Sequence, residues 1–423
     1  MKQILRLILI LPCLISCSTS VDTKNIILAN NSDRERVDEV FIINRNQLKS
    51  ANKTLLPAIK NSTGEWIPSQ IDDLDKDGEW DELAFVYSFQ PNEQVTLSIE
   101  WIPAESYPVF TPRTNARYGK MLSPGNIVIL KTDLHGKDNL ARGAGYPYQT
   151  DGPAWENDKM GFRHYFDGRN VRDIFGKRTD KMVMDTVGIR SDGIVGDTYH
   201  ELRWWGRDIM SGGNSIGLGG IALQTPDSLI RLGVTIDKTT DNIDSTRYTL
   251  VTNGPVRSIF KLDFYGWDIK GEKIDVDEKI TIWAGKFGYE NIIKTSTLPQ
   301  GTNLVTGIVN SFNDKPYEQA EIGDYKLMAT HDKQTYDKIW YMGMGLLIPR
   351  NNFVETFEVS KSGSGITTTW CAKLKPNENE EYHFNCYAAW ELTDERFTDR
   401  EYFLKMMRTY TDNLNNKIVP VLK

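Results

Sequence analysis

The feature that most constrains the fold is a period-two alternation of apolar and polar residues that recurs along the chain. It is clearest at residues 95–101, 230–236 and 260–265. Successive side chains of an extended strand point to opposite faces, so the alternation predicts strands with one buried face and one wet face. Such strands are typical of antiparallel sheets. The 11 Trp and 18 Tyr residues belong to types that are frequent in strands. We therefore expect an all-β fold.

One segment near the C-terminus has helical spacing instead. Within residues 398–414, Thr398 and Glu401 are spaced as a capping box. An apolar stripe follows at helical intervals, formed by Tyr402, Phe403, Met406, Met407, Tyr410 and Leu414. We expect a C-terminal helix that packs this stripe against a sheet.

The 423 residues are more than one small domain needs. The strand pattern is interrupted by four prolines, namely Pro103, Pro108, Pro112 and Pro124. We place a boundary there and expect a small N-terminal β-sandwich at residues 22–105. Residues 106–423 are expected to form a large two-sheet β-sandwich that carries the active site, because most of the unusual residues lie in it.

The first residues have the form of an export signal. Lys2 and Arg6 precede an apolar run that is too short to span a bilayer as a helix. The run ends in LISC at residues 14–17, which resembles the lipobox of bacterial lipoproteins. Residues 1–17 are therefore expected to be a lipoprotein signal, with a lipid on Cys17 as the only membrane contact. The alternative is an ordinary signal peptide that is cut nearby.

The expected location follows from the residues after this cysteine. No acidic cluster follows Cys17, which favours an outer-membrane lipoprotein that faces the periplasm over one at the cell surface. The formal charge of −7 argues against a nucleic-acid partner, which requires a basic surface. In an oxidising compartment, Cys371 and Cys386 either pair across two strand-like segments or stay free.

Residues 70–85 (QIDDLDKDGEWDELAF) contain alternating carboxylates followed by a turn glycine. This spacing resembles the start of a calcium loop, where oxygens at alternate positions converge on a hard cation. Ala84 stands where such a loop has its bidentate Glu. The segment is therefore either a structural Ca²⁺ site or a solvated acidic turn. The candidate ligands are Asp73, Asp75, Asp77 and Asp81.

Two further motifs have weak support. GGNSIG matches G-x-S-x-G at Ser215, but LGGIALQ follows, which reads as a turn and then a strand. A nucleophile elbow requires a helix at that point, so we expect a glycine-rich β-turn. The sequence has no HExxH and no closely spaced His pair, so a catalytic zinc site has no local support.

The remaining signal lies between residues 151 and 208. Residues 160–178 hold five Lys or Arg and only two acids, within an acidic chain. Aromatic rings stack on pyranose faces, Arg grips carboxylate or sulfate, and His or Tyr transfers protons. The alternative is a set of buried rings and surface ion pairs. The candidate residues are Glu156, Asn157, Arg163, His164, Tyr165, Asp173, Lys177, His200, Arg203, Trp204, Trp205, Arg207 and Asp208.

At these residues the chain resembles a family of unassigned function that is common in polysaccharide-degrading gene clusters of Bacteroidetes. The segments GPAWENDKMGFRHYFD, RNVRDIFGK and YHELRWWGRDIMSGGNSIGLGG carry the resemblance, together with DDLDKDGEWDEL. It covers nearly the whole mature chain. The larger domain of the family is similar to the galactose-mutarotase-like supersandwich, and a related activity is the dehydration of oligosaccharides that end in a uronic acid. The two-His-plus-Glu set of mutarotases cannot be placed on this chain.

We therefore expect an enzyme that acts on acidic, uronic-acid-containing oligosaccharides by β-elimination, as a dehydratase or a lyase. Arg163, Arg203 or Arg207 would neutralise the substrate carboxylate. His200 or Tyr165 would remove the proton, and the other of the two, or His164, would protonate the leaving oxygen. The other expected substrate contacts are Trp204 or Trp205 stacked on a sugar ring, with Glu156, Asn157, Lys177 and Asp208.

Two alternatives stay open. One is a glycoside hydrolase that uses paired carboxylates, with Glu156, Asp173 and Asp208 as the candidates. The other is a non-catalytic glycan-binding lipoprotein, in which Arg and Trp residues matter but His200 and Tyr165 do not.

Overall fold

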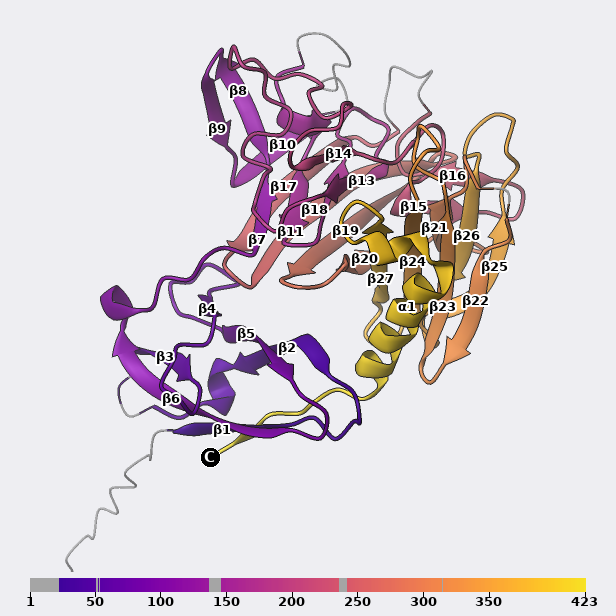
Figure 1. Cartoon of the computed structure of the whole chain (residues 1–423). Coiled ribbons are helices and arrows are strands. Elements are labelled where there is room, and N and C mark those ends of the chain that lie inside the picture. Colours follow the sequence, from indigo (N-terminus) through magenta and orange to yellow (C-terminus); the bar gives the residue numbers. More distant parts are fainter. Residues whose placement is uncertain (1–22, 51, 53, 137–145, 236–241, 314) are drawn as a thin grey trace, which may run out of the picture.

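The computed structural model describes residues 23–50, 52, 54–136, 146–235, 242–313 and 315–423. The predicted signal with Cys17 lies outside these residues, as does Ile236. Among the helices in the described ranges, none combines the length and the apolarity that a bilayer crossing requires. Figure 1 shows the N-terminal strands below a larger assembly of sheets, with the helix α1 (Arg400–Asn415) beside that assembly.

The N-terminal part consists of two antiparallel sheets. Their strand orders are β28-β1-β6-β3 and β2-β5-β4. Phe41, Phe85 and Leu97, drawn from both sheets, belong to one buried cluster, so the sheets share a core. The strands are β1 (Asn25–Ala29), β2 (Arg36–Asn44), β3 (Leu55–Lys60), β4 (Ser69–Asp72), β5 (Glu82–Phe89), β6 (Gln94–Pro103) and β28 (Val421–Leu422).

The C-terminal strand β28 pairs with β1, with Leu422 opposite Ile26. The C-terminus therefore lies beside β1 (Figure 1). The expected division after residue 105 stays a prediction, but this pairing brings the last residues into the N-terminal sheet.

A nine-stranded antiparallel sheet dominates the larger part, in the order β10-β17-β18-β19-β20-β27-β24-β23-β22. The predicted alternation of Phe260, Leu262 and Phe264 lies in β18, where all three side chains are buried. The strands are β10 (Thr132–Gly136), β17 (Ser245–Asn253), β18 (Arg257–Ile269), β19 (Glu272–Trp283), β20 (Gly288–Thr295), β22 (Glu318–Ile322), β23 (Tyr325–Asp332), β24 (Met342–Pro349) and β27 (Tyr382–Trp390).

Two five-stranded sheets, ordered β14-β13-β12-β11-β7 and β16-β15-β21-β26-β25, share a core with the nine-stranded sheet. Phe162, Ile221 and Phe260 come from the three sheets and belong to the same buried cluster. The all-β sandwich prediction is therefore confirmed. The strands are β7 (Thr114–Arg117), β11 (Ala154–Asn157), β12 (Met160–His164), β13 (Arg172–Lys177), β14 (Gly206–Asp208), β15 (Leu218–Gln224), β16 (Leu229–Arg231), β21 (Asn303–Val309), β25 (Phe353–Glu358) and β26 (Thr369–Leu374), with a separate hairpin of β8 (Gly119–Ser123) and β9 (Asn126–Ile129).

The predicted C-terminal helix is α1 (Arg400–Asn415). Its buried stripe contains Phe403 and Met407, which pack in one cluster with Leu327 and Leu347 of β23 and β24. The predicted capping box is wrong in detail, because the carboxylate of Asp399 caps the helix by accepting from the Glu401 amide at 2.9 Å. Thr398 instead ends the preceding 3-10 turn η4 (Glu395–Thr398), where its hydroxyl donates to Glu395. The other 3-10 turns are η1 (Arg45–Gln47), η2 (Ala104–Ser106) and η3 (Gln149–Asp151).

The strand expected over residues 230–236 is shorter than predicted, because β16 ends at Arg231. Gly233 has φ +87° and lies against the backbone of Gly168, a conformation that a regular strand cannot continue through.

The two cysteines lie in different sheets, since Cys371 belongs to β26 and Cys386 to β27. Both are free and buried. A disulfide across a hairpin is therefore wrong, because the two strands that carry the cysteines do not pair.

Candidate functional site

The candidate site lies on the outer face of the β12–β13–β14 part of its sheet. Arg163 is opposite Asp173, and Phe175 is opposite Asp208. Because side chains alternate along strands, Arg163, Asp173 and Phe175 share one face. Phe175 packs in one cluster with Tyr199 of the segment that follows β13. Residues 178–205 therefore fold over this face and cover the charged groups on it.

Arg163 is the centre of the site and its side chain is fully buried. Its Nη2 donates to the carboxylates of Asp173 and Asp208, at 2.6 Å each. Nη2 also bonds the hydroxyl of Tyr165, which lies 3.0 Å from Asp173. Nη1 lies 3.6 Å from Asp151 and has no hydrogen-bond partner among the described residues. One guanidinium thus binds two carboxyl groups through hydrogen bonds and lies at ion-pair distance from a third.

Burial raises the pKa of two carboxyl groups in this site, Asp208 and Asp151. The pKa of Asp208 is raised well above its ordinary value, first by burial and then by the nearby charge of Asp173, against the opposing effect of Arg163. Burial also raises the pKa of Asp151, again against Arg163. A raised pKa is the direction of shift that a carboxyl group needs to serve as a proton donor.

His200 lies at the solvent edge of this network. Its side chain is 53% exposed, and its Nε2 is 3.9 Å from the Oδ2 of Asp208. Its carbonyl oxygen accepts from Arg207 at 2.5 Å and from the Tyr336 hydroxyl at 2.8 Å. Arg207 is held in turn by Asp337 at 3.0 Å. The backbone of His200 is therefore fixed while its imidazole stays open to a ligand.

A second open edge is formed by Asp151, whose side chain is 29% exposed. Its Oδ2 lies 3.0 Å from the hydroxyl of Tyr199, and the ring of Tyr199 stands edge-on to the imidazole of His200, with centroids 4.9 Å apart. The side chain of Tyr199 thus contacts both accessible titratable groups, Asp151 and His200. Asp151, Tyr199, Tyr336 and Asp337 were not among the predicted site residues.

Exposed side chains next to His200 suit a sugar. Trp204 is 65% exposed, and Arg203 is 49% exposed and paired with Glu201 at 2.9 Å. Trp205 is buried with its ring edge-on to Phe175, so its predicted stacking role does not fit. Trp204 is the better of the two predicted platforms.

Several predicted site residues lie away from this edge. His164 points to the opposite face, where its ring contacts Phe264 of β18 and its Nε2 contacts Asn170 at 2.8 Å. Burial lowers the pKa of His164 well below its usual value, and the charge of the nearby Arg172 lowers it further. A neutral core histidine does not fit the predicted role of a proton donor to substrate. Tyr165 is also buried, and burial raises its pKa well above the ordinary value, which disfavours it as a base.

Glu156, Asn157 and Lys177 form a buried structural group rather than substrate contacts. Lys177 donates to Glu156 and to the Asn157 carbonyl, at 2.6 Å each. The other carboxylate oxygen of Glu156 accepts the amides of Val183 and Met184, at 2.7 Å each. This ion pair therefore anchors the segment that covers the site.

The basic run also turns inward for the most part. Arg169 pairs with Asp167, and Arg172 pairs with the buried Glu278. Arg163 and Arg207 are bound to aspartates of the chain and are almost fully buried. Their predicted role in neutralising a substrate carboxylate therefore does not fit their environment, because their charge is already balanced. Arg203 remains the accessible member of the three predicted arginines.

The G-x-S-x-G match is a turn, as expected. The hydroxyl of Ser215 donates to the Gly212 carbonyl at 2.6 Å and accepts from the Gly217 amide at 3.0 Å. The hydroxyl is thus used within the turn, and β15 follows directly.

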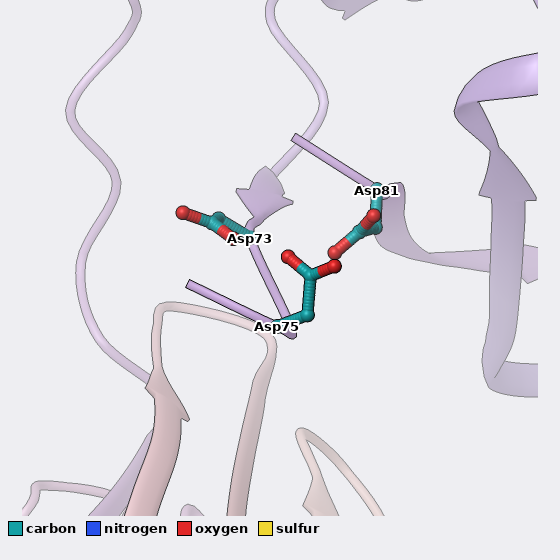
Figure 2. A group of neighbouring side chains, drawn as sticks. All are labelled: Asp73, Asp75 and Asp81. Carbon is teal, nitrogen blue, oxygen red and sulfur yellow. The ribbon is translucent and has the colours of Figure 1, made fainter. Parts of the chain in front are cut away.

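Three of the four predicted calcium ligands converge. Asp73, Asp75 and Asp81 each offer a carboxylate oxygen within 4.8 Å of the others. Figure 2 shows Asp75 and Asp81 turned towards each other with Asp73 beside them. Asp77 is not a member of this group, and its carboxylate accepts the Glu79 amide at 2.8 Å. Oxygen ligands of this kind suit Ca²⁺, so structural calcium stays a prediction, with three carboxylate ligands in place of four.

Comparison with known proteins gives a family match and distant likenesses. The family model described as "Domain of unknown function (DUF4861)" matches residues 28–419. The Uncharacterized protein P7 of Formosa agariphila is 21% identical over 422 residues, which cover 95% of this chain and 94% of that protein. These matches agree with the predicted resemblance to a family of unassigned function.

Two solved structures from Enterococcus faecalis are similar over 95% of this chain. One is a protein in the Glycosyl Hydrolase Family 38, with 9% identity and a TM-score of 0.48, and the other is an alpha-mannosidase, with 10% identity and a TM-score of 0.47. This chain covers 47% and 46% of those chains, about half their length. Likenesses at this level do not bear on the activity of this chain, which has to be argued from its own site.

Proposed function

Since the chain belongs to the family described as "Domain of unknown function (DUF4861)", whose description names no activity, we propose a function from the site itself. The protein is a carbohydrate-active enzyme that acts on acidic, uronic-acid-containing oligosaccharides by β-elimination. The single observation that carries this proposal is the position of His200, an exposed imidazole with a fixed backbone, 3.9 Å from the buried carboxyl of Asp208.

The elimination requires a base, an acid and a group that neutralises the substrate carboxylate. His200 takes the proton from the carbon next to that carboxylate, because imidazole is the usual side chain for proton transfer near neutral pH. The electron pair of the broken C–H bond forms the new double bond, and the bond from the adjacent carbon to its oxygen breaks. Asp151, whose carboxyl is partly exposed and whose pKa is raised by burial, gives its proton to the leaving oxygen.

Arg203 faces the substrate carboxylate in this scheme. It is the exposed arginine of the segment that carries His200 and Trp204. Its pairing with Glu201 joins two exposed side chains, so a substrate carboxylate can replace Glu201 at little cost. Trp204 offers its exposed ring to a pyranose face. Arg163 has no substrate contact here and acts by holding Asp173, Asp208 and Asp151.

Hydrolysis is the second candidate, supported by one observation. The pKa of the partly exposed Asp151 is raised, as a general acid requires, and Asp208 lies on the same guanidinium. The predicted candidates Glu156 and Asp173 do not favour hydrolysis, because both are buried and ion-paired. A non-catalytic glycan-binding protein is the third candidate, and in that case His200 has no chemical role.

Product analysis separates these candidates. The mature protein is incubated with uronate-terminated oligosaccharides, and the products are analysed by mass spectrometry. Dehydration predicts the loss of one water, and lyase cleavage predicts two fragments without added water. Fragments that have gained water would establish hydrolysis, and unchanged substrate across a panel of uronate oligosaccharides would refute both enzymatic candidates.

We also propose that the protein is held by a lipid on Cys17 at the periplasmic face of the outer membrane. A Cys17→Ala variant is then expected to lose the lipid and to leave the membrane fraction. Equal membrane association of the variant and the wild type would contradict this anchor.

A further inference from the structure

A groove of about 770 Å³ lies at the other end of the strands that carry the site. It is lined by the turn between β11 and β12, by the residues that follow β13, and by α1. Its volume falls in the range of about 300–1,000 Å³ that is typical of ligand sites. Nothing in the proposed reaction uses this groove.

Three cations in the groove lack a charged partner among the described residues. They are Lys159, Arg178 and Lys405, and none of them has an ion pair in that part of the chain. Of the four carboxylates in the lining, two are paired within 2.7 Å, Asp158 with Arg113 and Asp394 with Arg396. The other two are Glu35 and Asp180, so unpaired cations outnumber unpaired carboxylates by three to two among the described residues of the lining. Unpaired cations in a groove attract an anionic ligand, and the attraction is notable in a chain with a formal charge of −7.

Arg178 has a special place in this set. It is the last cation of the basic run at residues 160–178, and the four cations before it are bound to carboxylates of the chain. Among the five cations of this run, only Arg178 has a guanidinium without an ion pair to a described residue, and it lines the groove. Within this basic run, an anion from solution can therefore bind at Arg178 but not at the buried arginines.

The groove is also within reach of a ligand that occupies the site. Lys159 directly precedes β12, and Arg163 lies four residues further along the chain. Four residues of extended strand span about 13 Å, which is the separation of Lys159 and Arg163 along the strand. The amide of Arg178 donates to the carbonyl of Trp205 at 2.7 Å. The groove thus adjoins the segment that carries Trp204 and His200, so an oligosaccharide can contact both places.

We propose that this groove binds the anionic group of a second sugar unit, a carboxylate or a sulfate, on the saccharide whose other unit reacts at His200. The inference rests on the proposed function for the identity of the ligand as a saccharide. Arg178, Lys159 and Lys405 hold the anion, with the guanidinium able to grip it through two bonds. Glu35 and Asp180 also line the groove and accept bonds from sugar hydroxyls.

The test compares two pairs of charge-removing substitutions. Arg178→Gln with Lys405→Gln removes two groove cations, and Lys24→Gln with Lys49→Gln removes two exposed cations from the N-terminal part. Both pairs change the net charge equally. Binding is measured by calorimetry in a His200→Asn background, so that turnover does not disturb the titration. The probes are trigalacturonate for carboxylate, a carrageenan tetrasaccharide for sulfate, and cellotriose as the neutral control.

The groove substitutions are expected to weaken binding of the preferred anionic probe by about tenfold, since two exposed ionic contacts are lost. The N-terminal pair is expected to change it by less than about twofold, and cellotriose is expected to respond to neither pair. The probe that loses affinity identifies carboxylate or sulfate as the anion. Equal weakening by both pairs, or no binding of either anionic probe, would overturn the proposal.

Failure of the groove and failure of the proposed reaction give different results. If the groove pair alters binding but wild-type protein forms no product from any uronate oligosaccharide, the binding site stands and the reaction is wrong. If product forms and the groove pair leaves KM unchanged, the reaction stands and the groove proposal is wrong.

Discussion

Replacement of Asp208 by Asn tests whether this buried carboxyl carries a proton in the native protein. Asn has the same size, and its one amide oxygen can take the place of Oδ2 and accept from Arg163, which bonds Asp208 at 2.6 Å. Only the longer bond from the Met210 amide to Oδ1, at 3.2 Å, then loses its acceptor. Arg163 also keeps its bond to Asp173. The variant should therefore fold, and the main change is the loss of one titratable group.

The magnitude follows from the raised pKa. Between the ordinary pKa of aspartate and the raised pKa of Asp208, the folded protein holds this proton while the unfolded chain has lost it. Unfolding in that window releases a proton, so this group stabilises the wild type at low pH and the contribution is lost as pH rises. Each unit of pKa elevation corresponds to about 1.4 kcal/mol. Asn has no proton to lose, so the stability of the variant relative to wild type should increase with pH.

Urea unfolding of both proteins at about pH 4 and about pH 8 measures this difference. Asp33→Asn, at an exposed position, is the matched control, and its stability relative to wild type should change little between the two conditions. A relative stability of the Asp208 variant that is unchanged or lower at the higher pH would refute the reasoning, because it would mean that Asp208 is ionised throughout.

Three further predictions concern other contacts. Tyr336→Phe removes one hydrogen bond to the His200 carbonyl, so kcat on the uronate substrate should fall about fivefold with stability within about 1 kcal/mol of wild type; an unchanged kcat would contradict the positioning role. Lys177→Met leaves Glu156 buried without its cation, so urea unfolding should give a loss of about 3–5 kcal/mol, and a loss under about 1 kcal/mol would contradict the ion pair. Calcium should raise the Tm of wild type and should raise that of Asp81→Asn less, while equal Tm shifts in thermal unfolding would exclude this loop as the site.

The fold class followed from local patterns because a sheet with one buried face repeats every two residues. Leu97 and Ile99 of β6 and Phe260 of β18 show this pattern, and all three are buried. The exceptions arise where a distant contact decides the conformation. β16 ends early because Gly233 takes a positive φ against the backbone of Gly168. The cysteines lie in separate sheets, and strand pairing between distant segments has no local signal.

The site was only partly predictable for the same reason. The run around Arg163 and His200 was identified from residue types, since arginines, carboxylates and aromatic rings are concentrated there. The sequence does not tell which face of β12 is buried against the core. Adjacent residues of a strand point to opposite faces, so Arg163 and His164 lie on different sides of the sheet. Tyr336 and Asp337 reach the site from a loop 130 or more residues away, so no local pattern could connect them with His200.

The central claim is that the exposed imidazole of His200 removes a proton from an acidic saccharide. The most direct measurement is the rate at which the absorbance of unsaturated uronate appears when equal amounts of wild type and His200→Asn act on the same oligosaccharide. The account predicts a loss of at least about 100-fold in the variant, with unchanged urea unfolding, because the side chain is half-exposed. Equal rates for the two proteins would contradict the account.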